Sequence, residues 1–103
     1  MDRDAFYAPE VYRIEGELML INSEIDAAEK CLRTALDLAR SRAEKSLELR
    51  AATSLVRLWR GQGKSQEAFH LLADIYGFFT EGFETRDLLT AKAIMAELAS
   101  TCG

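Results

Sequence analysis

The residues of this chain that could perform acid–base chemistry gather around His70, its only histidine. Glu67 and Asp74 lie three and four residues away, so both carboxylates could reach the imidazole on a helix. Catalysis would also require a nucleophile near the base, and Cys31 could supply a thiol. A small hydrolase using His70 or Cys31 is therefore one alternative. Because histidine–carboxylate pairs are common on solvated helix surfaces, we expect no catalytic residue.

The remaining candidates for metal or cofactor chemistry have the wrong spacing. Cys31 and Cys102 are far apart and match no metal-binding or redox pattern, and Cys31 lies on an apolar helical face that predicts a small core residue. Glu15 and Glu17 are two residues apart, which places them on different faces of a helix. We therefore expect no metal site and no cofactor.

Two arginines could bind an anion. Arg50 and Arg57 are seven residues apart, so they share one face of a predicted helix. Guanidinium groups in that position could hold a peptide carboxylate through bidentate hydrogen bonds. The alternative is that both are ordinary surface charges, paired with Glu44, Glu48 or solvent.

The composition favours one soluble domain spanning residues 1–103. Apolar residues make up 49% of the chain and charged residues 29%, which argues against disorder. The formal net charge is −4, whereas proteins that bind nucleic acid carry a basic surface. The chain opens with no signal-peptide pattern, and no apolar run approaches a membrane span. We expect a cytoplasmic protein that binds neither nucleic acid nor membrane.

Apolar residues recur at helical spacing in five segments, which predicts an all-α fold. The predicted helices cover about residues 10–21, 24–42, 46–61, 65–79 and 85–100. No segment alternates with a period of two for long enough to indicate a strand, and the short connections predict antiparallel neighbours. The apolar stripe of the first helix has steps of 3, 4 and 3 residues and consists of Val11, Ile14, Leu18 and Ile21.

Several residues predict where the helices begin and end. Ser23 and Thr85 are the expected N-caps of the second and fifth helices. Gly61 and Gly63 should end the third helix, and Gly82 should permit the turn before the fifth. We expect the aromatic residues Trp59 and Tyr76 to pack in the core. Three phenylalanines should pack under the fifth helix, namely Phe78, Phe79 and Phe83.

The chain contains an internal repeat. Residues 22–36 align with residues 62–76, which pairs Ala28 with Ala68 and Leu32 with Leu72. Each copy has a long helix, a polar turn and a helix with small residues. Because a helical hairpin cannot cover its own apolar face, the repeat predicts hairpins that stack on one another.

This pattern resembles tetratricopeptide repeats, in which a bulky residue precedes a small one by four positions and the next helix carries alanine, a bulky residue and alanine. The second copy departs at Val56 and Ile75, which replace small residues, and the interval between the two copies exceeds the usual ~34 residues. The resemblance implies a right-handed stack of antiparallel hairpins, with repeats at 10–42 and 46–79 and a capping helix at 85–100. The first copy matches at Tyr12, Gly16, Ala28, Leu32 and Ala35.

In tetratricopeptide stacks the first helix of each hairpin lines a concave groove. The resemblance therefore implies a groove on this chain that binds a protein or a peptide. By repeat position, the residues facing it would be Arg13, Glu17, Arg50, Thr53 and Arg57.

Nearly the whole chain also resembles the C-terminal repeat region of large bacterial signalling ATPases, which include adenylate-cyclase-linked and LuxR-type regulators. The likeness rests on residues 11–20, 27–40, 46–64 and 79–98, and its most specific part is EGFETRDLLTAK at residues 81–92. The chain has no GxxxxGK(S/T) phosphate-binding loop. The resemblance therefore implies the helical scaffold and not the ATPase.

We expect a non-catalytic protein-interaction or scaffold module, as a stand-alone or truncated piece of a signalling or transcriptional regulator. The alternative is a homo-oligomerisation module without a peptide ligand. Two repeats leave the N-terminal face of the first hairpin uncovered. Tyr7, Tyr12 and Met19 should then be exposed there, and an exposed apolar end could form a two-fold homodimer.

Overall fold

The computed structural model describes residues 9–79 and 85–102, which form five α-helices and no strand. The predicted all-α class is confirmed, and the helix ends agree with prediction to within two residues apart from the end of the fourth helix. That helix stops at Tyr76 because the amides of Phe78 and Phe79 bond to carbonyls three residues back. The elements are α1 (Pro9–Ile21), α2 (Ile25–Ser41), α3 (Lys45–Gly61), α4 (Ser65–Tyr76) and α5 (Arg86–Cys102).

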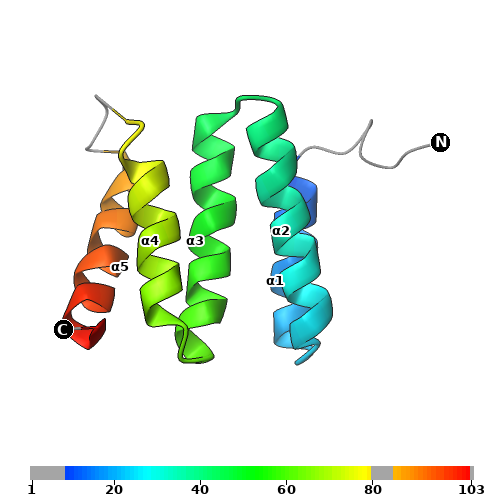
Figure 1. The fold of residues 1–103 in the computed structure, drawn as a ribbon. Coiled ribbons are helices and arrows are strands. Elements are labelled where there is room, and N and C mark those ends of the chain that lie inside the picture. Colours follow the sequence, from blue (N-terminus) through cyan, green and yellow to red (C-terminus); the bar gives the residue numbers. More distant parts are fainter. Residues whose placement is uncertain (1–8, 80–84, 103) are drawn as a thin grey trace.

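Each helix runs opposite to the one before it (Figure 1). Helices that follow one another in sequence pack together, and α3 also contacts α1 and α5. α3 therefore touches all four other helices. As a result, the six consecutive residues 51–56 of α3 are all buried.

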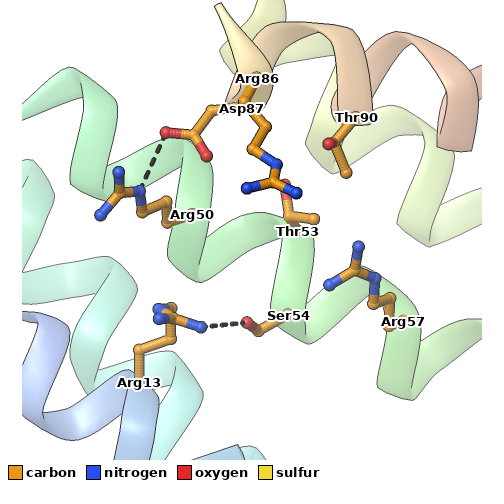
Figure 2. A pocket seen from close by; sticks show the side chains of 8 residues that line it. All are labelled: Arg13, Arg50, Thr53, Ser54, Arg57, Arg86, Asp87 and Thr90. Atoms are coloured by element: carbon orange, nitrogen blue, oxygen red, sulfur yellow. Dashed lines mark hydrogen bonds and ion pairs between the residues drawn. The ribbon is translucent and has the colours of Figure 1, made fainter.

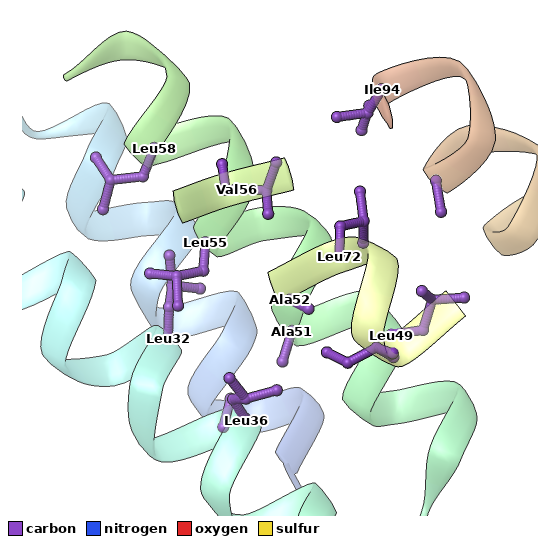
Figure 3. Close-up of a cluster of buried hydrophobic side chains, with 14 of the residues drawn as sticks. Leu32, Leu36, Leu49, Ala51, Ala52, Leu55, Val56, Leu58, Leu72 and Ile94 are labelled. Atoms are coloured by element: carbon purple, nitrogen blue, oxygen red, sulfur yellow. The ribbon is translucent and has the colours of Figure 1, made fainter. Parts of the chain in front are cut away.

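Leucines from three helices form the centre of the core (Figure 3). Leu32 of α2, Leu55 of α3 and Leu72 of α4 have no exposed surface. α1 approaches α2 closely at Gly16, where a Cβ atom would lie 2.9 Å from Leu32 Cδ2 and 3.2 Å from the carbonyl oxygen of Ala28. A glycine at this position thus allows the backbones of the two helices to approach more closely than a larger residue would permit.

Three connections share one backbone geometry, and they are evenly spaced along the chain. Each contains a residue in the left-handed region: Ser23 (φ 62°), Ala43 (φ 55°) and Gly63 (φ 77°). The next amide donates a hydrogen bond of 2.8–2.9 Å to the carbonyl five residues back, which is the Schellman arrangement at a helix end. The prediction of Ser23 as an N-cap is wrong, because Glu24 occupies that position and its side chain makes no capping bond.

The apolar stripe of α1 faces solvent. The expectation that Tyr12 is exposed at this end is wrong: its side chain is 6% exposed, because it lies on the side of α1 that packs against α2 and α3. Met19 is half-buried, and Tyr7 lies outside the described residues. Four other side chains are between 37% and 78% exposed, namely Val11, Ile14, Leu18 and Ile21.

The aromatic residues belong to the core only in part. Phe78 was expected under the fifth helix but is 63% exposed, with Lys45 Nζ 4.3 Å from its ring centroid. It lies in the tightened turn after α4, which directs it away from the core. Gly82 and Phe83 lie outside the described residues. Three aromatic side chains are half-buried against the core: Trp59, Tyr76 and Phe79.

Replacing Ala43 by glycine should stabilise the protein, because alanine at φ 55° pays a steric cost that glycine avoids. We expect the free energy of unfolding, measured by urea denaturation, to rise by about 0.5–1 kcal/mol. The reciprocal change Gly63→Ala should lower it by about 1 kcal/mol. Gly61→Ala is the control, since a Cβ there meets nothing within 4 Å, and it should stabilise α3. Equal effects of Gly63→Ala and Gly61→Ala would contradict this account of the turns.

Candidate functional site

A hollow of about 220 Å³ opens on the side of the molecule formed by α1, α3 and α5 (Figure 2). It contains four arginines, three hydroxyl residues and a single aspartate. Positive charge therefore gathers at this place on a chain whose formal net charge is −4. This arginine hollow is lined by Arg13, Arg50, Thr53, Ser54, Arg57, Arg86, Asp87 and Thr90.

The directions of the helices bring these residues together. α1, α3 and α5 run the same way (Figure 1), and both outer helices pack on α3. α3 supplies the middle of the lining through Arg50, Thr53 and Arg57, which share one helix face. Thr53 and Ser54 are 8% and 2% exposed, so these short side chains form the base of the hollow between the longer arginines.

Two of the arginines are held by carboxylates. Arg13 forms a bidentate pair with Glu10, at 2.7 and 3.1 Å, and its Nη1 donates to Ser54 Oγ at 3.5 Å. Arg50 donates to Asp87 Oδ2 at 2.9 Å and to Glu10 Oε2 at 3.5 Å. The hydrogen bond from Arg13 lowers the pKa of Glu10. The bond to Glu10 raises the pKa of Arg13, and the bond to Asp87 raises that of Arg50.

The other two arginines have no such partner. Within residues 9–79 and 85–102, the side chains of Arg57 and Arg86 make no hydrogen bond and no ion pair. Their guanidinium groups are both directed into the arginine hollow, one from α3 and one from α5 (Figure 2). Each guanidinium presents five N–H donors in a planar fork that matches a carboxylate or a phosphate. The arrangement is therefore suited to binding an anionic group.

The arginine hollow contains four of the five residues predicted for a groove: Arg13, Arg50, Thr53 and Arg57. Glu17 does not line it, although its charge acts on Arg13 from one turn further along α1. The alternative partners Glu44 and Glu48 do not pair with Arg50. Instead, Glu48 is 2% exposed and bonds to Arg40 and Lys45 at 3.0 and 3.3 Å.

Sequence reasoning missed the contribution of α5. The arginine hollow is lined in part by Arg86, Asp87 and Thr90, whereas no residue of this helix is among the groove residues predicted from the sequence. A usable signal was present, because a fifth antiparallel helix must run in the same direction as the first and the third. Its first turn therefore lies at the same end of the molecule as Glu10, in the first turn of α1, and Arg50, in the second turn of α3.

The candidates for catalysis lie elsewhere. His70 is exposed on α4, with its ring against Phe69 at a centroid distance of 6.1 Å. Cys31 is half-buried on α2, and its Sγ lies 3.6 Å from Met19 Sδ. Neither residue lines the arginine hollow. In the described ranges no group of three or more histidine, cysteine, aspartate or glutamate side chains could hold a metal ion.

Of the helices that the structure describes, none is both long enough and apolar enough to cross a membrane.

Glu10→Gln should destabilise the protein at neutral pH, because it removes the carboxylate that holds Arg13 and reaches Arg50. Since the pKa of Glu10 is lowered in the folded state, its stabilising contribution is present above the unfolded value of 4.5 and is lost as pH falls through the folded value. We expect a difference of up to about 1 kcal/mol in urea unfolding at pH 7, because both side chains are partly exposed.

The difference in free energy of unfolding between wild type and Glu10→Gln should then decrease as the pH is lowered below 4.5. Glu67→Gln removes an exposed carboxylate on α4 and is the control for a general effect of charge. If the two proteins differed by the same free energy of unfolding at low and neutral pH, the ionised Glu10 carboxylate would not be the source of the stabilisation.

Comparison with known proteins found no similar family model, no similar curated protein and no similar solved structure. A function for this chain therefore rests on the residues described above.

Proposed function

We propose that this chain is a non-catalytic protein-interaction module, and that the arginine hollow binds an acidic group of a partner protein. The observation that carries the proposal is the pair Arg57 and Arg86, which are directed into the hollow and have no acidic partner among the described residues. Arg13 and Arg50 stand beside them, already held in place by carboxylates. A bound carboxylate or phosphate would thus meet oriented donors.

The size of the hollow favours one side-chain group over a whole metabolite. Its volume of about 220 Å³ is below the ~300–1,000 Å³ of typical small-molecule sites. The polar lining of arginines and hydroxyl groups provides hydrogen-bond donors and little apolar surface. An acidic side chain or a terminal carboxylate on a larger partner fits this chemistry.

For the scaffold we propose a tetratricopeptide-like, right-handed stack, with α1–α2 and α3–α4 as two repeats and α5 as the cap. Equivalent positions support it: Ala28 and Ala68, and Leu32 and Leu72, are all completely buried. The packing of α1 on α3 and of α3 on α5 is what successive repeats require. By its sequence resemblance, such a scaffold would serve a signalling or transcriptional regulator.

Reversing the two arginines that lack partners should abolish binding to an acidic ligand. The probe is a fluorescent glutamate-rich peptide, and its affinity for wild type and for the double variant Arg57→Glu/Arg86→Glu is measured by anisotropy. We expect at least a tenfold loss of affinity, because each arginine supplies a charge-assisted hydrogen bond. Added salt should weaken wild-type binding.

The double variant Lys30→Glu/Lys92→Glu is the matched control, since it makes the same charge change at two exposed residues outside the arginine hollow. It should leave the affinity unchanged. The proposal fails if wild type does not bind the peptide, or if the control loses as much affinity as the double variant.

Self-association is a second candidate function, and the exposed stripe of α1 favours it. Its residues Val11, Ile14, Leu18 and Ile21 have steps of 3, 4 and 3, which read the same in both directions. Two copies of α1 packed antiparallel about a two-fold axis would therefore place Val11 against Ile21 and Ile14 against Leu18. Such a self-complementary surface suits a closed dimer, and burying exposed aliphatic surface would stabilise it.

Leu18→Glu should abolish such a dimer. We expect sedimentation of the wild type to show a concentration-dependent dimer, and the variant to remain monomeric, because a charge would be placed in the apolar contact. Leu89→Glu on α5 is the control, because Leu89 is 53% exposed and Leu18 is 55% exposed, so both variants place a charge at an equally exposed leucine. A wild type that is monomeric at high concentration would exclude this function.

A further inference from the structure

A second hollow, with apolar walls, adjoins the arginine hollow. It has a volume of about 500 Å³ and lies between the end of α1, the start of α2 and the end of α3. Arg57 lines both hollows, so they are contiguous along α3. This apolar hollow is lined by Leu20, Ile25, Arg57, Leu58, Gly61 and Gln62.

The chemistry of the apolar hollow differs from that of its neighbour. The aliphatic carbon comes from Leu20, Ile25 and Leu58, and among the described residues Arg57 is the only charged one that lines this hollow. Ile25 is 38% exposed, so part of this surface is in contact with water. A bulky aliphatic side chain from a ligand would cover it, and burial of that surface is favourable.

The spacing of the two hollows along α3 limits what can fill both. The α3 residues of the arginine hollow range from Arg50 to Arg57, and those of the apolar hollow from Arg57 to Gly61. The midpoints of these two ranges are between five and six residues apart, which corresponds to roughly 8 Å at the helical rise of 1.5 Å per residue. In a polyproline II segment, residues three apart lie on the same side of the chain and are about 9 Å apart.

We infer that the partner of this chain presents an extended segment in which an acidic residue and a bulky aliphatic residue are three positions apart. The acidic side chain enters the arginine hollow, and the aliphatic side chain enters the apolar hollow. Arg57 lies at the boundary, where it contacts the acidic group with its guanidinium and the aliphatic group with its methylene chain. This inference rests on the proposed function, because it takes the arginine hollow to be the acidic subsite.

The test compares serine- and proline-based peptides that each contain one glutamate. Two peptides carry leucine three residues before or three residues after the glutamate, and two controls carry leucine next to the glutamate or serine in place of leucine. We expect one of the two spaced peptides to bind about tenfold more tightly than both controls. Binding is followed by NMR titration of the labelled protein.

Gly61→Leu should remove this advantage. A Cβ at Gly61 meets nothing within 4 Å, so leucine can fill the apolar hollow without disturbing α3, and Gly61→Ala is the control that adds only a methyl group. The spaced peptide should then bind Gly61→Leu no better than the serine peptide does, and should keep its advantage with Gly61→Ala.

The outcomes separate the two proposals. Glutamate peptides that bind equally well with and without spaced leucine overturn the inference and leave the acidic subsite in place. A preference for spaced leucine that persists in Gly61→Leu also overturns it. If neither these peptides nor the glutamate-rich peptide binds the wild type, the proposed function fails as well.

Discussion

The packing of α3 against four other helices is the constraint on which the rest of the molecule depends. A helix surrounded in this way has no room for long polar side chains along its middle, and residues 51–56 are accordingly small or aliphatic and all buried. Thr53 and Ser54 satisfy the same constraint with short polar side chains. Because they are short, the surface is recessed there, and the neighbouring arginines surround the recess. Core packing and the arginine hollow thus have a common cause.

Internal ion pairs give the arginine hollow its fixed geometry. Arg50 of α3 bonds to Asp87 of α5, and a second contact between these helices joins Arg60 to Glu97. Exposed pairs of this kind contribute little to stability, but they restrict the side chains that take part. Arg57 lies between the two contacts along α3, and Arg86 directly precedes Asp87 on α5. The hollow therefore combines arginines that are oriented by the protein with arginines available to a ligand.

The helices could be predicted from the sequence because the apolar periodicity, the glycines and the short polar turns all indicated the same helix ends. Repeat position correctly predicted that Arg13, Arg50, Thr53 and Arg57 lie together, but it also predicted Glu17, which does not line the arginine hollow. The role of α5 could not be obtained in that way, since it belongs to neither repeat copy and only the direction of its axis places Arg86 beside the others.

The errors also have physical reasons. A stripe at helical spacing indicates one face of a helix but not whether a partner covers it, so α1 shows Val11 and Leu18 exposed while Tyr12 is buried. Ser23 has the chemistry of a cap, but the turn required a left-handed residue at its position. In both cases the sequence pattern identified a helix face or a helix boundary correctly, but tertiary packing or the turn conformation determined the role of the individual residue.

The evenly spaced turns at Ser23, Ala43 and Gly63 define a unit of one helix rather than of two. Gain or loss of a single such unit during evolution would reverse the direction of every helix that follows it, and the arginines at the start of α5 would move to the opposite end of the molecule. Only a change of two units together preserves the orientation of later helices. The backbone of the turns thus explains why a hairpin, and not a single helix, is the smallest piece by which such a protein can be lengthened without losing a site shared between its helices.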